Sequence, residues 1–68
     1  MLVLNYQAVS VLSARKVMSI TQVLKDANLS NWILVKMKTG KPVTSKTVGK
    51  LANALGVDVT EIVVMKEG

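Results

Sequence analysis

Apolar residues recur at helical spacing through the middle of this chain, and residues 19–40 carry the clearest pattern. Ser19 and Gln22 form the sequence Ser-x-x-Gln, a capping box in which each side chain can bond a backbone N–H of the other at a helix start. The apolar positions that follow share one helix face, at Val23, Leu24 and Ala27. Asn28 then tolerates the left-handed conformation at which a helix stops sharply. This segment therefore predicts a short helix.

A second short helix is predicted directly after this stop. Ser30 can cap the new helix, and Gly40 is the residue type that ends one. Between them, Leu34 and Met37 give the helix a buried edge. Two short helices joined by a tight turn form a helix-turn-helix pattern.

The most regular amphipathic pattern follows a non-helical connector at residues 41–43. Pro42 prevents a helix there, because proline pushes the residue before it into extended geometry. Thr44 or Ser45 can cap the next helix, and Gly56 stands where a helix-ending glycine belongs. Its inward positions follow the i, i+3, i+4, i+7 spacing at Val48, Leu51, Ala52 and Leu55.

Both ends of the chain carry weaker signals. A second capping box, from Asp58 to Glu61, predicts a short last helix. That helix would bury Val59, Ile62 and Val63. Alternatively, residues 63–66 are extended, and an apolar tail on so small a domain suggests a partner surface.

Residues 1–4 form a strand or a packed tail, and a helix is predicted from Asn5 to Val17 with Asn5 as its cap. Its inward positions are Ala8, Val9 and Leu12, with Val11 as a further candidate; Ser13, Arg15 and Lys16 are expected to face water or DNA. Together the segments predict one compact all-α domain of five short helices over residues 1–68, with the helix-turn-helix at the second and third. A chain of 68 residues has room for one small core.

The charge is uneven along the chain. The net charge is +5, and residues 30–50 contain five lysines and no acidic residue. Elsewhere the cations are balanced by carboxylates. A localised basic region is typical of a surface that binds a polyanion, although a lysine-rich face can also serve only for solubility.

Composition argues against catalysis and membrane insertion. The chain has no cysteine and no histidine, and its four carboxylates are scattered, so no nucleophile–base pair, acid–base pair or metal cluster can be drawn. We therefore expect no enzyme activity, no cofactor or metal and no small-molecule substrate. The longest apolar runs are far shorter than the roughly 18 residues of a membrane span, and the N-terminus lacks the basic start of a signal peptide. A cytoplasmic protein without membrane contact is expected.

The order of these elements resembles a known family. The run GKPVTSKTVGKLANALGVDVTEIV is very similar to that family's sequence from the end of the recognition helix through the last two helices. The turn at residues 28–30 and the residues Leu34, Met37 and Gly40 also match its pattern. The chain is identified as a member of the Cro/CI-type, lambda repressor-like helix-turn-helix family of phage and mobile-element regulators, over roughly residues 11–63.

The resemblance implies a transcriptional repressor that binds double-stranded DNA sequence-specifically, usually as a homodimer, and reads the major groove with the third helix. It implies base contacts from the start and outer face of that helix, at Asn31, Trp32, Ile33, Val35 and Lys36. It implies phosphate contacts at Thr21, Lys38, Lys41, Thr44, Ser45 and Lys46. These roles agree with base chemistry, because asparagine can pair with adenine and lysine can reach guanine.

The third helix departs from the family pattern, because residues 32–35 are continuously apolar. Trp32 and Ile33 could lie in the core, in the DNA groove with thymine methyls nearby, or in an exposed patch that binds a protein. Asn31 could instead be only a cap residue. The rival function is a protein-interaction module of the same fold, an antirepressor or docking partner, that uses the apolar face of this helix. A third alternative is nucleic-acid binding from charge alone.

Overall fold

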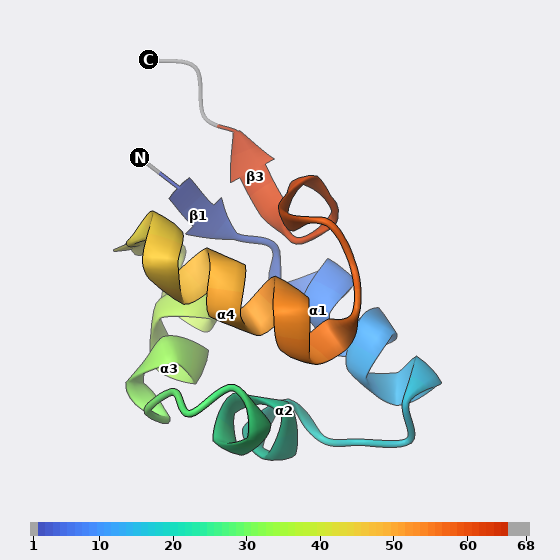
Figure 1. Ribbon diagram of the computed structural model, residues 1–68. Coiled ribbons are helices and arrows are strands. Elements are labelled where there is room, and N and C mark those ends of the chain that lie inside the picture. The colour runs from blue at the N-terminus through green and yellow to red at the C-terminus, as the bar shows by residue number, and fades with distance from the viewer. Residues whose placement is uncertain (1, 66–68) are drawn as a thin grey trace.

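The computed structural model describes residues 2–65 and shows a small helical body with a short sheet beside it (Figure 1). Within this range there are four α-helices, one short 3-10 helix and three short strands. In chain order they are β1 (Leu2–Leu4), α1 (Tyr6–Arg15), α2 (Ile20–Asp26), α3 (Trp32–Thr39), β2 (Pro42–Val43), α4 (Ser45–Leu55), η1 (Val59–Glu61) and β3 (Val63–Met65). The predicted helix-turn-helix is therefore present as α2 and α3.

The sheet corrects the expected all-α, five-helix architecture. β1 is its central strand and pairs antiparallel with both β2 and β3. The connector at residues 41–43 therefore contains a strand, with Leu2 opposite Val43. The predicted fifth helix is only the 3-10 turn η1, and the extended alternative is confirmed for residues 63–65, while residue 66 lies outside the described range.

The helix boundaries follow from local capping chemistry. Asn5 Oδ1 accepts a hydrogen bond from the Ala8 N–H at 3.1 Å, and Ser19 Oγ accepts one from the Gln22 N–H at 3.2 Å. The α4 cap is Thr44, whose side chain accepts from the Thr47 N–H. These bonds satisfy backbone donors that have no partner inside the helix.

Each α-helix is followed by a residue in the left-handed conformation. After α2, α3 and α4 these are Asn28, Gly40 and Gly56, as predicted. After α1 the left-handed residue is Val17, a β-branched residue for which this conformation is unfavourable.

The core lies where α1, α2, α3 and α4 meet the sheet. It is built from the predicted faces of α2 and α4, joined by residues of the other elements: Leu4, Val9, Val23, Leu24, Ile33, Met37, Val48, Leu51, Ala52, Leu55 and Ile62. Three expectations are wrong, because Val11 and Val59 are exposed and Ser13 is buried. Ser13 is satisfied there because its hydroxyl donates to the Val9 carbonyl at 2.7 Å.

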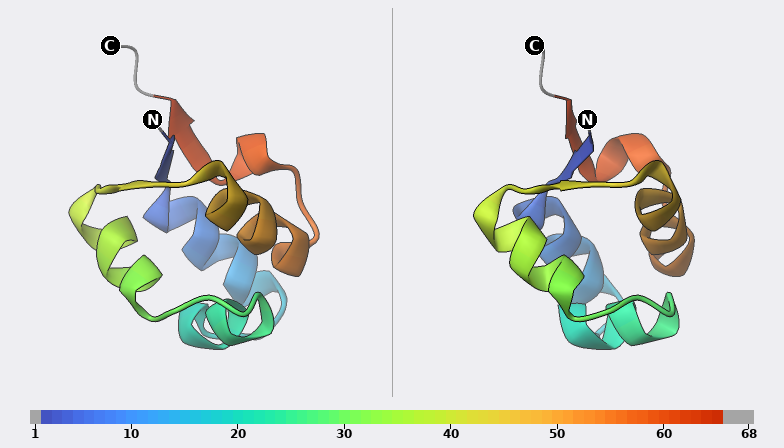
Figure 2. Two further views of the ribbon diagram at one scale, coloured as in Figure 1. Left: turned by 60° about the vertical axis from the view of Figure 1, so that its left-hand side comes forward. Right: turned by 90° about the vertical axis from the view of Figure 1, so that its left-hand side faces the viewer.

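α3 and the start of α4 lie on the same side of the molecule. In Figure 2 the chain leaves α3, runs along β2 and enters α4, so the three elements border the same side. β1 and β3 lie away from α2, near both ends of the described chain (Figure 1).

Candidate nucleic-acid interface

The outer surface of α3 is a stripe of four residues, Trp32, Val35, Lys36 and Thr39. At about 100° per residue, these positions fall within an arc of roughly 100° around the helix axis. Trp32 is 69% exposed and Val35 is 42% exposed, Thr39 is exposed and Lys36 is half-buried. We call these four residues the α3 stripe. Sequence reasoning had not included Thr39, although its spacing from Trp32 and Val35 could have indicated it.

The opposite side of α3 holds the helix against the core. Ile33 is 9% exposed and Met37 is 4% exposed, and both belong to the core cluster. Leu34 is partly buried against the same cluster, which confirms the predicted inner edge. Burial of Ile33 contradicts the expected base contact from this residue, because a side chain packed in the core cannot also reach a base edge. Of the alternatives considered for Trp32 and Ile33, a place in the core is confirmed for Ile33 and is wrong for Trp32.

The start of α3 presents Asn31 and Trp32 together. Ser30 Oγ accepts a hydrogen bond from the Trp32 N–H at 3.1 Å, so Ser30 carries out the predicted capping. Asn31 is exposed, and its side chain makes no capping hydrogen bond. Asn31 therefore stands at the cap position of α3, as the cap alternative expected, but its amide makes no capping bond and is available to an external partner.

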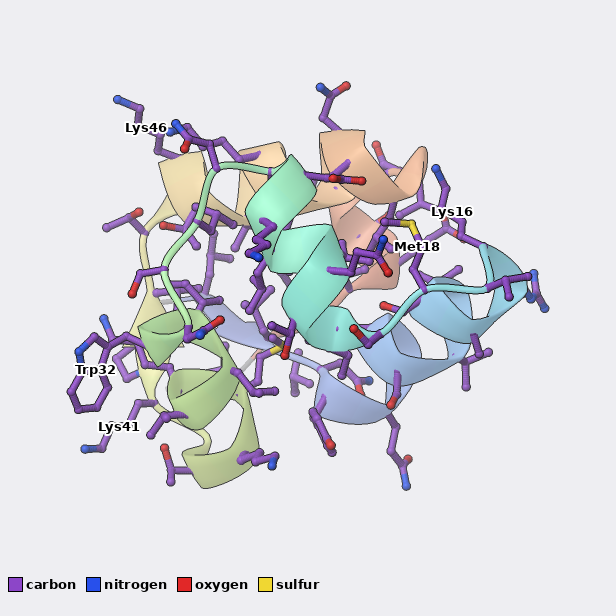
Figure 3. All side chains as sticks on the ribbon, turned by 90° about the horizontal axis from the view of Figure 1, so that it is seen from below. Lys16, Met18, Trp32, Lys41 and Lys46 are labelled. Atoms are coloured by element: carbon purple, nitrogen blue, oxygen red, sulfur yellow. The ribbon has the colours of Figure 1, made fainter. Side chains whose placement is uncertain are left out.

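Two lysines border the α3 stripe from other elements. Seen from below in Figure 3, Trp32, Lys41 and Lys46 project from one side of the molecule, while Lys16 and Met18 lie on the opposite side. Lys41 and Lys46 are both exposed. Lys41 precedes β2, and Lys46 stands in the first turn of α4. Two of the predicted phosphate-binding cations therefore lie on the same side of the molecule as Trp32 of the predicted reading helix.

Lys38 is placed differently from these two lysines. Its Nζ lies 6.0 Å from the centre of the Tyr6 ring, at the outer limit of a cation–π contact. It therefore stands on the flank of α3 toward the start of α1. A phosphate contact from Lys38 would compete with this ring contact.

The N-terminus of α4 adds polar groups on the Lys46 side. Thr44 and Ser45 are exposed, and the Thr44 and Thr47 hydroxyl oxygens are 3.0 Å apart. The first turn of α4 contains Lys46 and no acidic residue. Free backbone N–H groups and the helix dipole make such a helix start attractive to anions. Thr21, the remaining predicted phosphate contact, is exposed in the first turn of α2.

Other kinds of site find no counterpart in the described range. Among residues 2–65, no group of three or more histidine, cysteine or acidic side chains stands close enough to hold a metal ion. In the same part of the chain, no helix has the length and apolar character needed to cross a membrane.

Comparison with known proteins points to one family. A family model described as Cro/C1-type HTH DNA-binding domain matches residues 9–68, which is most of the chain. No curated protein and no solved structure matches. The matched region contains α2, α3, α4 and the whole α3 stripe.

Proposed function

Because the chain belongs to the family of Cro/C1-type HTH DNA-binding domains, we propose that it regulates transcription by reading a specific duplex sequence with α3 in the major groove. The observation that carries this proposal is the exposed α3 stripe bordered by Lys41 and Lys46. An α-helix fits the major groove of B-form DNA, whose base edges differ for every base pair. Cations on the same side of the molecule as this helix would meet the phosphate backbone.

The proposed base contacts come from the start and the outer face of α3. Asn31 and Lys36 supply the hydrogen-bonding groups, since an amide can pair with adenine N6/N7 and an ammonium with guanine O6/N7. Trp32 and Val35 supply apolar surface beside them. Ile33 has no part in this interface, because it packs in the core.

The proposed phosphate contacts come from elements around α3. Lys41 and Lys46 are the strongest candidates, because they are exposed on the side from which Trp32 projects. Thr44 and Ser45 would add hydroxyl and backbone donors at the start of α4. Thr21 and Lys38 complete the set, with Lys38 giving up its position over the Tyr6 ring.

We extend the proposal to a homodimer that represses transcription. β3 is an edge strand of the sheet, its sequence is Val-Val-Met, and Val64 is exposed on it. An apolar edge strand is a ready template for pairing with another chain. Repression needs no further contact, because a domain bound in the groove excludes other proteins from the same site.

Protein docking is the second candidate, and the exposure of Trp32 and Val35 is the observation that favours it. Tryptophan is enriched among the residues that dominate binding at protein interfaces. Docking through these two side chains would tolerate the loss of Lys41 or Lys46. DNA binding would not, so charge variants separate the two functions.

The test compares Lys46→Gln with Lys16→Gln, which remove the same charge from opposite sides of the molecule (Figure 3). Lys16 is exposed and donates to the Ala54 carbonyl at 3.2 Å, and glutamine retains a donor there. Binding to a short duplex is followed by the fluorescence of Trp32, the only tryptophan in the chain, over a series of salt concentrations.

Each phosphate contact contributes about 0.9 to the slope of log K against log salt concentration. We expect Lys46→Gln to lower this slope by about that amount for each bound protomer, and Lys16→Gln to leave it unchanged. An equal loss in both variants would indicate binding by net charge alone. No binding by the unaltered protein would exclude the DNA-reading function and favour protein docking.

A further inference from the structure

The α3 stripe has an unusual chemical balance for a surface that reads bases. Two of its exposed members are Val35, which is apolar, and Trp32, whose large apolar ring carries a single N–H donor. Thr39 already uses its hydroxyl hydrogen, because it donates to the Val35 carbonyl at 2.8 Å. Lys36 is the single charged residue of the stripe and is half-buried. Apolar surface from Val35 and from the indole ring of Trp32 therefore makes up much of the stripe.

Base edges offer few partners for such a surface. In the major groove, guanine, cytosine and adenine present hydrogen-bonding groups, whereas thymine also carries a C5-methyl group. An apolar side chain that covers a polar edge leaves donors and acceptors without water or a partner, which is unfavourable. The C5-methyl group is the part of an unmodified base pair that Val35 and the ring carbons of Trp32 can contact without this penalty.

The spacing of the two side chains sets the spacing of their targets. Trp32 and Val35 are three residues apart, which corresponds to about 4.5 Å along a helix axis. Successive bases along one strand of DNA are about 3.4 Å apart. A helix lying along the groove would therefore bring the two side chains to neighbouring base pairs.

We propose that Trp32 and Val35 select duplex sites in which neighbouring base pairs carry thymine methyl groups in the major groove. This inference rests on the proposed function and adds the class of DNA sequence that the α3 stripe prefers. Asn31 directly precedes Trp32 and has a free amide, which favours adenine in the same A·T-rich element.

The test begins with selection of duplexes from a random-sequence pool by the unaltered protein. We expect the enriched sequences to share two neighbouring A·T pairs. Each thymine of the best duplex is then replaced by deoxyuridine, which removes only the methyl group. Loss of one buried methyl should weaken binding roughly four-fold, because about 0.8 kcal/mol per buried carbon corresponds to that factor.

Variants then assign the methyl contacts to side chains. Val35→Ala should weaken binding to the thymine duplex and lose the deoxyuridine effect at one position. Because Val35 is exposed, this variant should keep the circular dichroism spectrum and melting temperature of the unaltered protein. Lys46→Gln is the matched control: it should bind both duplexes more weakly and keep the full ratio between them.

A further pair of duplexes separates the methyl group from the hydrogen-bonding pattern. One thymine·adenine pair is replaced by cytosine·guanine, and in a second duplex by 5-methylcytosine·guanine. The methylated duplex should recover part of the affinity lost in the other. Enrichment of sequences without thymine dependence would overturn this inference and leave the proposed function intact. Enrichment of no sequence at all would overturn both.

Discussion

Val17→Gly provides a sharp test of the structure, because it should stabilise the protein by removing a side chain. Val17 follows α1 with φ at +57° and is 91% exposed. Its N–H donates to the Ala14 carbonyl, and the Met18 N–H donates to the Ser13 carbonyl. These two bonds are those of the Schellman motif, in which a left-handed residue ends the helix.

The other helices show what this position normally requires. The same pair of bonds follows α2, with Asn28 as the left-handed residue, and α4, with Gly56. Glycine and asparagine adopt this conformation readily, whereas it is a clear outlier for a β-branched residue. Val17 is therefore held in its conformation by the bonds around it.

The expected gain follows from two opposing terms. An L-residue in the left-handed helical conformation is disfavoured by roughly 1–2 kcal/mol. Glycine has greater freedom in the unfolded chain, which costs about 0.5–1 kcal/mol. Because Val17 is almost fully exposed, little burial is lost. Val17→Gly should therefore raise the free energy of unfolding by about 0.5–1 kcal/mol, or the melting temperature by roughly 2–8 °C.

Urea titration followed by circular dichroism measures this change, with Val17→Ala as the control. Alanine removes the same methyl groups but remains an L-residue, so it should give a smaller gain than glycine. A decrease in stability for Val17→Gly would refute the reasoning. It would mean that Val17 does not adopt the left-handed conformation or that its side chain makes stabilising contacts.

Three further changes test the core, α4 and η1. Gly49→Ala should stabilise the protein by about 1 kcal/mol, because Gly49 lies inside α4 and nothing lies within 4 Å of an added Cβ. A lower free energy of unfolding for this variant in a urea titration would contradict the prediction. Leu51→Ala should cost about 2–5 kcal/mol, because Leu51 is fully buried, and an unchanged melting curve would refute its place in the core. The Thr60 hydroxyl and N–H bonds to the Asp58 carboxylate hold the pKa of Asp58 below its ordinary value of 3.8, so its stabilising effect at neutral pH is lost as the pH falls through that lowered pKa. Thr60→Val should raise the pKa of Asp58 in an NMR titration, whereas an unchanged pKa would contradict the hydroxyl's role.

The helices that carry the site could be predicted because their signals are local. Each of α2 and α4 combines a side-chain cap, an apolar face at helical spacing and a left-handed stop within about a dozen residues. Backbone bonding within four residues determines these features, so a single stretch of sequence contains them. The capping box at Asp58 and Glu61 was likewise predicted and is formed, although the turn it begins is only a 3-10 helix.

The sheet could not be predicted in the same way, because it depends on pairing between distant segments. β1 joins residues 2–4 to residues 42–43 and 63–65, and β2 is only two residues long. Pro42 excludes a helix, as predicted, but proline is also tolerated on an edge strand. Strands this short carry no alternating pattern that could reveal the sheet.

Part of the candidate site could also be predicted from the sequence, and part of it could not. The exposure of Asn31, Lys41 and Lys46 agrees with their predicted positions on the surface. Within α3, the continuous apolar run at residues 32–35 has no periodicity, so it could not show which side chains face inward. The packing of α3 against the core determines which side chains face inward: Ile33 is buried, whereas Trp32 and Val35 are exposed.

The most direct test of the DNA-reading claim is an NMR titration of isotope-labelled protein with its selected duplex, first at low salt and then at near-physiological salt. We predict that amide shifts concentrate at residues 31–36, Lys41 and residues 44–46, and that these shifts persist at the higher salt concentration. Shifts confined to Lys16 and the far end of α1, or no shifts at saturating duplex, would contradict the reading of DNA by α3.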